Sequence, residues 1–181
     1  MMWRRVASAY LALIALAAAS VVAVQAGSPA IPDNLKVPQQ NVQLLKTQAT
    51  GVQVYVCKAR AEDPSTFEWS FKGPIAELWN ERGEKVGKHY GGPTWEGNDG
   101  STVVAEVVER ANAPDPDSIP WLLLKAKSNP GAGAFSTVTY VQRLDTAGGV
   151  APTDGCDQAR AGTEREVGYT ATYAYYYGAA Q

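Results

Sequence analysis

The chain contains a single histidine, His89, and only two cysteines, Cys57 and Cys156. One histidine is too few for a zinc or copper site built from several imidazoles, and no Cys-x-x-Cys pair supplies thiolates instead. A serine triad would have to use His89 as its base, and the Gly-x-Ser-x-Gly sequence of the α/β-hydrolases is absent. The sequence therefore predicts neither a metal nor another cofactor.

Nucleotide and nucleic-acid binding also lack support. The segment "GAGAFS" (131–136) has no third glycine of the dinucleotide fingerprint and precedes a strand-like stretch, and there is no Walker lysine motif. The 16 basic and 18 acidic residues are scattered, with no basic cluster. We therefore expect no nucleic-acid partner.

The N-terminus has the layout of a secretory signal peptide. Arg4 and Arg5 precede an apolar run over residues 6–24, and small side chains lead to a cleavage site after Ala26. The alternative is a retained membrane anchor, since the run approaches spanning length. We expect removal of residues 1–26, which leaves a secreted or periplasmic protein without a membrane span.

The two cysteines both follow that cleavage site. An even number of cysteines in an exported protein favours a disulfide, here Cys57 with Cys156, over free thiols or metal ligands. The closed loop of about 100 residues would stabilise the fold by about 4 to 5 kcal/mol in the chain-entropy model.

The sequence predicts strands nearly throughout. Period-two alternation begins in "GVQVYVC" (51–57), turn signals recur about every dozen residues, and no stretch keeps a helical period. We therefore expect an all-β fold, an antiparallel β-sandwich or flattened barrel of about 7 to 9 short strands. Residues 27–48 should form an extended lead-in, and residues 49–181 a single domain.

Three details refine this prediction. Gly73–Pro74 should end a strand, and the apolar run in 119–128 should be buried on both faces. The final strand places Tyr169, Tyr173, Tyr175 and Tyr177 on one face. Such a row either fills the core or offers a platform for sugars or peptides, and we favour the core because aromatic residues prefer strands.

The stretch "VGKHYGGPTWEGNDGS" (86–101) gathers the candidate site residues. If Val86 and Tyr90 pack inward, His89 faces solvent or a groove. The functional interpretation of the stretch 86–101 is a ligand-binding patch. The alternative is that its composition only serves a glycine–proline bend and an Asn-Asp-Gly turn. The ligand-binding candidates are His89, Tyr90, Trp95 and Glu96, and the catalytic candidates are His89, Glu96 and Asp99. A loose calcium site was also weighed, from Glu96, Asp99, Asp115 and Asp117.

Several of these motifs occur together, in the same order, in a known family. The segments "GVQVYVC", "VGKHYGGPTWEGNDGS", "IPWLLLKA" and "YTATYAYY" resemble the secreted bacterial and fungal family DUF3455, a domain of unknown function. The resemblance runs from about Ile31 to Tyr177. It implies an exported domain and supplies no activity, substrate or catalytic residue.

Three hypotheses follow. The first is a non-catalytic secreted domain that binds an unknown ligand or a component of the cell envelope or extracellular space. The second is a small hydrolase or lyase that uses His89 with Glu96 or Asp99. The third is a purely structural envelope protein. The shortage of catalytic groups favours the first.

Overall fold

The computed structural model describes residues 29–179, so the expected signal peptide lies outside the described residues. The two helices in this range, η1 (Asp33–Leu35) and η2 (Gln158–Arg160), are single 3-10 turns, and neither is long and apolar enough to cross a membrane. The strands are β1 (Asn41–Ala59), β2 (Phe67–Trp79), β3 (Lys85–Tyr90), β4 (Thr94–Gly97), β5 (Thr102–Ala111), β6 (Trp121–Ser128), β7 (Val138–Gly148) and β8 (Glu164–Gly178).

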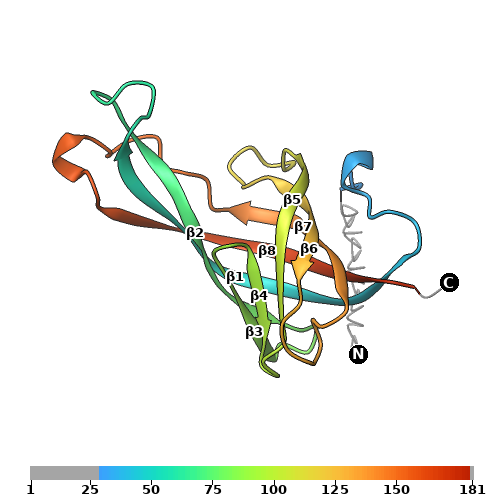
Figure 1. The fold of residues 1–181 in the computed structure, drawn as a ribbon. Coiled ribbons are helices and arrows are strands. Elements are labelled where there is room, and N and C mark those ends of the chain that lie inside the picture. Colours follow the sequence, from blue (N-terminus) through green and yellow to red (C-terminus); the bar gives the residue numbers. More distant parts are fainter. Residues whose placement is uncertain (1–28, 180–181) are drawn as a thin grey trace, which may run out of the picture.

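Each strand pairs in antiparallel fashion with the next, and β8 pairs with β1, so the sheet closes into a barrel (Figure 1). The predicted all-β antiparallel class is confirmed, and of the two shapes considered the structure adopts the closed one. Successive connections alternate between the two ends of such a barrel. We call the end with the β1–β2, β3–β4, β5–β6 and β7–β8 connections the upper end, and the other the lower end.

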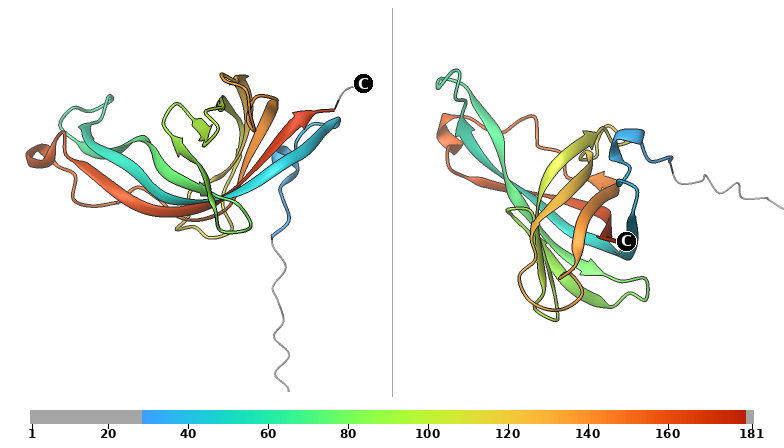
Figure 2. Two further views of the ribbon diagram at one scale, coloured as in Figure 1. Left: turned by 90° about the horizontal axis from the view of Figure 1, so that it is seen from below. Right: turned by 45° about the vertical axis from the view of Figure 1, so that its right-hand side comes forward.

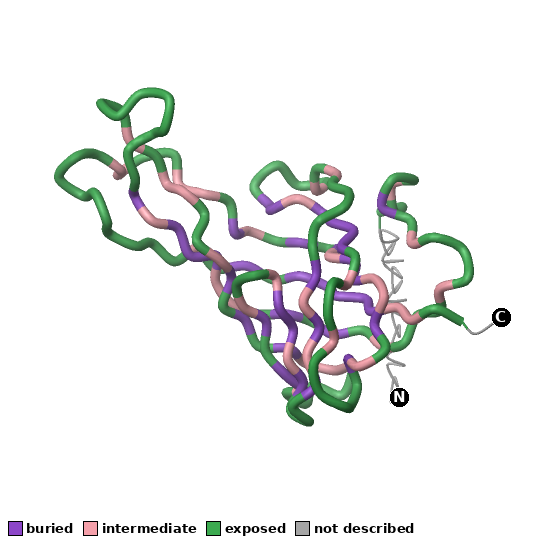
Figure 3. The backbone as a smooth tube through the Cα atoms, viewed as in Figure 1, coloured by how far each residue is buried: buried purple, intermediate pink, exposed green. Residues whose placement is uncertain are grey.

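The core lies inside the barrel, where every second side chain of each strand points inward. Tyr169, Tyr173 and Tyr175 of β8 are all buried there, together with Trp95 of β4. The prediction that the tyrosine face fills the core is confirmed for these three, whereas Tyr177 at the end of the row is only half-buried. Figure 3 shows the buried backbone concentrated in the middle of the barrel and the exposed backbone in its connections.

A second, smaller core lies on the outside of β6 and β7. Trp121, Leu123 and Leu144 pack there against Leu35, which η1 places on this face. The inward residues Leu122 and Leu124 belong to the main core. The first part of β6 is therefore buried on both faces, as the sequence predicted, because the lead-in segment covers its outer side.

The barrel begins earlier than residue 49. Residues 41–48, expected in the lead-in, form the first part of β1 and pair with the last part of β8. The apolar spacing of this segment is compatible with a turn of helix or a strand, and the choice is made by pairing with residues more than 120 positions away. Local sequence carries no information on that pairing.

Gly73–Pro74 does not end a strand, because β2 is continuous across it. The register with β1 shifts there, so that Val54 lies opposite Gly73 while Tyr55 lies opposite Phe71. A bulge of this kind lets an antiparallel strand accommodate a proline, which cannot donate to the ladder.

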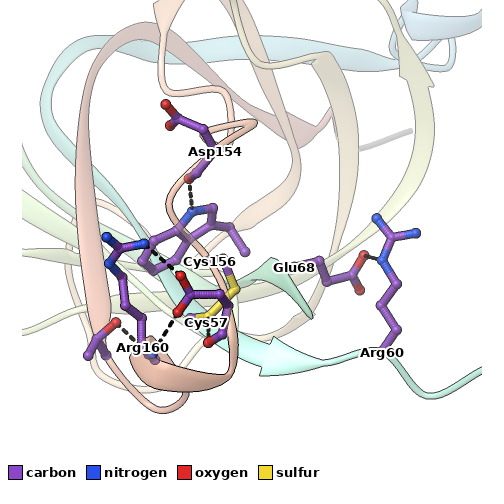
Figure 4. The surroundings of a disulfide bond; sticks show 9 residues. Cys57, Arg60, Glu68, Asp154, Cys156 and Arg160 are labelled. Atoms are coloured by element: carbon purple, nitrogen blue, oxygen red, sulfur yellow. Dashed lines mark hydrogen bonds and ion pairs between the residues drawn. A yellow bond between two sulfur atoms is a disulfide. The ribbon is translucent and has the colours of Figure 1, made fainter. Parts of the chain in front are cut away.

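The upper parts of β1, β2 and β8 project from the barrel as an arm (Figures 1 and 2). The predicted disulfide is present on this arm and joins Cys57 at the end of β1 to Cys156 in the β7–β8 connection, with the Cα atoms 5.4 Å apart. Beside it, the Trp69 indole donates a hydrogen bond of 2.7 Å to the carbonyl of Asp154 (Figure 4). The disulfide and this hydrogen bond hold the long glycine-rich β7–β8 connection against the arm.

Candidate functional site: a cavity inside the barrel

The β3–β4 hairpin divides the residues of the 86–101 stretch between two faces. His89 pairs with Trp95 across the hairpin, and both side chains are buried inside the barrel. Tyr90 and Glu96, one position further along, point to the outer face. Gly92 in the connecting turn adopts φ 97°, a left-handed conformation that glycine accepts without strain. The arrangement considered from the sequence was the opposite one, with Tyr90 inward and His89 facing solvent or a groove. In the structure His89 points inward and faces a cavity, and Tyr90 points outward.

Tyr90 and Glu96 form a surface cluster with Lys88. The Tyr90 hydroxyl donates to Glu96 Oε2 at 2.9 Å, and Lys88 Nζ lies 3.1 Å from Oε1. These hydrogen bonds, with Lys88 the larger effect, hold the pKa of Glu96 below its ordinary value. The carboxylate therefore serves a cross-strand ion pair and makes no contact with His89.

Asp99 lies at the lower end of the barrel, in the β4–β5 turn. Its Oδ1 accepts hydrogen bonds from the hydroxyl and backbone amide of Ser101, and Oδ2 accepts from the backbone amide of Ala134 at 2.7 Å. These bonds lower the pKa of Asp99, the Ser101 hydroxyl most strongly. Asp99 ties two lower connections together and is not part of a pair with His89.

The four acidic residues weighed as a calcium site are not brought together. Asp115 and Asp117 lie in the upper β5–β6 connection, whereas Asp99 lies at the lower end. Within residues 29–179 no three histidine, cysteine or acidic side chains gather closely enough to hold a metal ion.

His89 is enclosed by aromatic rings. It stacks on Trp95 with centroids 4.4 Å apart and planes 10° from parallel, and it meets the edge of Tyr173 at 5.0 Å. Nδ1 lies 2.8 Å from the carbonyl oxygen of Thr94. A carbonyl only accepts, so Nδ1 carries the proton. Burial lowers the pKa of His89 to about 3, so the neutral ring keeps Nε2 as a free acceptor.

His89 and Trp95 form part of the wall of a cavity of about 350 Å³ in the upper half of the barrel. This volume is within the range of small-molecule sites. Most of the wall is apolar, and the connections at the upper end surround it. The lining residues are Gln53, Tyr55, Phe71, Pro74, His89, Pro93, Trp95, Val107, Arg110, Ile119, Pro120, Leu122, Leu124, Arg143 and Tyr173.

Several polar groups on this wall lack protein partners. Gln53 Nε2, Trp95 Nε1 and the hydroxyl of Tyr173 are buried without a hydrogen bond to any described residue. Buried polar groups are normally hydrogen-bonded, because desolvation without a partner is costly. Three of the five such groups among the described residues therefore lie around this one cavity, as in a site that a ligand completes.

Five polar lining residues were not assigned to a site from the sequence, namely Gln53, Tyr55, Arg110, Arg143 and Tyr173. The signal for Arg143 was available, because the alternation of β7 places it on the same face as Val141, which is fully buried. A charged residue in phase with core positions is rare unless it is paired or functional. Gln53 follows the same logic in β1, where it is buried in phase with Ala49.

The fold and the cavity define the class: a closed antiparallel barrel of eight strands with a ligand-sized hollow at its upper end. The chain belongs to the family described as "Protein of unknown function (DUF3455)", whose profile matches residues 38–177. The resemblance noted in the sequence is thereby confirmed. No curated protein matches the chain. No solved structure matches it either.

Proposed function

We propose that this chain binds a small, largely apolar organic molecule inside the upper half of its barrel. The observation that carries the proposal is the cavity of about 350 Å³ whose wall holds buried polar groups without protein partners. An apolar hollow with a few converging polar groups is the usual form of a ligand site. His89 and Trp95 are then ligand-contacting residues, and Tyr90 and Glu96 support the hairpin from outside.

Binding fits the geometry better than hydrolysis. A histidine base is normally oriented by a carboxylate and placed beside a nucleophile. Here the Nδ1 proton of His89 is held by a backbone carbonyl, and none of the described residues that line the cavity is an aspartate or glutamate. The neutral imidazole acts as a wall and a hydrogen-bond acceptor.

The proposal also places the protein outside the cytosol. Disulfides persist in oxidising compartments, and the Cys57–Cys156 bond supports export. The signal-peptide pattern of residues 1–26 supports the same conclusion. A secreted or periplasmic carrier of a small apolar molecule accounts for both the compartment and the cavity.

The lone histidine supplies a direct test. Because the chain contains one histidine, protein made without a histidine tag and labelled in the imidazole ring gives one set of imidazole signals by NMR, and that ring lies on the cavity wall. Octanoate and its neutral isostere octanamide are titrated to millimolar concentration. Saturable movement of the His89 signal by at least one probe supports binding in the cavity, and no movement with either would overturn it.

A matched pair of variants locates the binding. Val107 and Val108 are neighbours on β5 with nearly equal exposure, 41% and 42%, but only Val107 lines the cavity. Val107→Trp should block the cavity and abolish the response, whereas Val108→Trp should leave it unchanged. Equal responses from the two variants would place binding elsewhere and contradict the proposal.

A further inference from the structure

We propose that the bound molecule is a monocarboxylate, whose carboxylate pairs with Arg143 while its apolar body fills the rest of the cavity. This inference rests on the proposed function and names the chemical class of its ligand. It depends on the position of Arg143, the kind of hydrogen-bonding group left free around it, and the absence of a protein carboxylate from the cavity wall.

Arg143 lies inside the barrel on β7. Its cross-strand neighbours are Leu122 on β6 and Tyr173 on β8, both of which belong to the inner wall. Its Nε donates to the carbonyl of Pro120 at 3.1 Å, which fixes the guanidinium at the upper end of the cavity. Among the described residues, the Pro120 carbonyl is the one acceptor that this guanidinium meets with normal hydrogen-bond geometry, although the guanidinium also lies close enough to the Tyr173 hydroxyl to lower the pKa of that phenol.

No acidic side chain among residues 29–179 forms an ion pair with Arg143. The ion pairs of the described residues involve exposed side chains, and Arg143 belongs to none of them. A partly buried cation without a counter-ion is costly, because it loses solvation and gains no partner. An arginine fork matches a carboxylate in a planar, two-pronged geometry. A ligand carboxylate would supply the missing partner.

The Arg143 charge acts on the groups around the cavity. Burial is the main cause of the pKa shifts of Tyr55, His89 and Tyr173, raising the two phenols and lowering the imidazole. In all three, the positive charge of Arg143 acts in addition and favours the less positive form. The guanidinium is therefore electrostatically close to three different walls of the cavity.

The free polar groups beside Arg143 are donors. Gln53 Nε2 and the Tyr173 hydroxyl are buried without a hydrogen bond of normal geometry to a described residue, and Arg143 lines the same cavity and brings further N–H groups. An ionised carboxylate only accepts hydrogen bonds and offers about four lone-pair sites. A neutral alcohol or amide would leave part of this donor set unsatisfied. His89 Nε2 is a free acceptor on the wall of the same cavity.

The rest of the cavity sets the size and character of the ligand body. Leu122, Leu124 and Val107 line it with aliphatic surface, and the His89–Trp95 stack adds an aromatic wall. A volume of about 350 Å³ equals that of roughly a dozen water molecules in the liquid. Medium-chain fatty acids and phenyl-substituted short acids match this volume and polarity.

The test compares acids with isosteric amides. Octanoate with octanamide, and 3-phenylpropanoate with 3-phenylpropanamide, are titrated by calorimetry at neutral pH while the His89 ring signal reports occupancy. A charge-assisted hydrogen-bonded pair should favour each acid over its amide by about ten- to a hundredfold. Equal affinities of acid and amide, with both moving the His89 signal, would overturn this inference and leave the proposed function standing. No response to any probe would overturn the proposed function itself.

Variants assign the preference to one residue. Arg143→Met keeps the length of the side chain and removes the charge, so it should weaken acid binding far more than amide binding and abolish the preference for acids. Arg143→Lys keeps the charge without the fork and should retain part of the preference. Arg110→Gln is the matched control, because Arg110 also lines the cavity but is exposed. Loss of the preference in Arg110→Gln but not in Arg143→Met would overturn the assignment.

If Arg143→Met fails to fold, the wild-type comparison still decides. High salt weakens interactions of exposed charges far more than those of buried ones. The acid preference of the wild-type protein should therefore survive about 0.5 M sodium chloride with less than a threefold loss. A preference that disappears in salt would point to an exposed cation and contradict a role for Arg143.

Discussion

The imidazole of His89 lies parallel to the indole of Trp95, with 4.4 Å between ring centroids. The two residues are directly opposite each other on β3 and β4, and the edge of Tyr173 closes the third side. The one histidine of the chain is thus built into an aromatic wall, where only its Nε2 is left to meet a ligand. Its burial has a consequence for stability as well as for binding.

His89 should make the fold less stable in mild acid. Its folded-state pKa is lowered by burial to about 3, whereas the unfolded chain titrates near 6.5. Below the unfolded value, the unfolded state takes up a proton that the folded state refuses, so stability falls as pH drops from 6.5 toward 3. Urea denaturation at several values between about pH 5 and 6.5 should show a loss of up to about 1 kcal/mol per pH unit.

His89→Phe is the control for this effect, since it keeps a planar ring against Trp95 and cannot titrate. The free energy of unfolding of this variant should change little between about pH 5 and 6.5, because the chain has no other imidazole. A slope of the same size in His89→Phe and the wild-type protein would show that other groups cause it. An NMR titration in which the His89 ring gains a proton near pH 6.5 would contradict the lowered pKa.

The disulfide should account for a large share of the stability. Cys57 and Cys156 are separated by 99 positions, and a crosslink over such a loop is worth about 4 to 5 kcal/mol in the chain-entropy model. The double variant Cys57→Ala, Cys156→Ala should lose about that amount in urea denaturation. Mass spectrometry of the unreduced protein provides the direct check, and two thiols that react with an alkylating agent in the native protein would rule the bond out.

The lead-in segment should stabilise the barrel from outside. Leu35 is fully buried against Trp121 and Leu123, so Leu35→Ala should cost about 2 to 5 kcal/mol. Ile31 lies in the same segment but is exposed, and Ile31→Ala should cost less than about 0.5 kcal/mol. Chemical denaturation of the two variants separates a docked segment from a loose one. Equal effects of the two substitutions would mean that η1 does not anchor the segment.

The local alternation of apolar residues was enough to predict strands, antiparallel pairing and the inward face of β8. It could not predict that β1 starts at Asn41 or that β2 runs through Pro74, because both depend on partners distant in sequence. The disulfide was predictable from the number of cysteines and the compartment. The choice between a sandwich and a closed barrel depends on one pairing, β1 with β8, that local patterns do not encode.

The site was predictable only in part. Of the ligand-binding candidates, His89 and Trp95 stack on the cavity wall, whereas Tyr90 and Glu96 lie on the outer face, because a hairpin has two faces and its sequence does not say which face meets the cavity. Glu96 and Asp99 are near His89 in sequence but not in space. Strand alternation turns Glu96 to the outer face, and Asp99 lies in a connection at the lower end of the barrel. Arg143 lies 54 positions further along the chain than His89, and only closure of the barrel brings the two to one cavity.

Two tyrosines of β8 that lie two residues apart should respond differently to loss of their hydroxyls. The Tyr175 hydroxyl shares a hydrogen bond of 3.3 Å with the Thr47 hydroxyl, whereas that of Tyr173 is buried without a partner beside the cavity. Tyr175→Phe should therefore cost about 1 kcal/mol, because it leaves Thr47 unpaired in the core. Tyr173→Phe should leave the free energy of unfolding unchanged or raise it, because it removes an unsatisfied polar group.

Ligand affinity should depend on the Tyr173 hydroxyl and not on that of Tyr175, the reverse of their effects on stability. Tyr173→Phe removes a donor from the carboxylate site and should weaken octanoate binding by about five- to tenfold and octanamide binding by less, whereas Tyr175→Phe should leave the affinity for both probes unchanged. Urea denaturation and calorimetry on the same two variants measure both quantities. A Tyr173→Phe variant that is less stable than the wild-type protein and binds octanoate equally well would mean that this hydroxyl is satisfied within the protein and contributes nothing to the cavity.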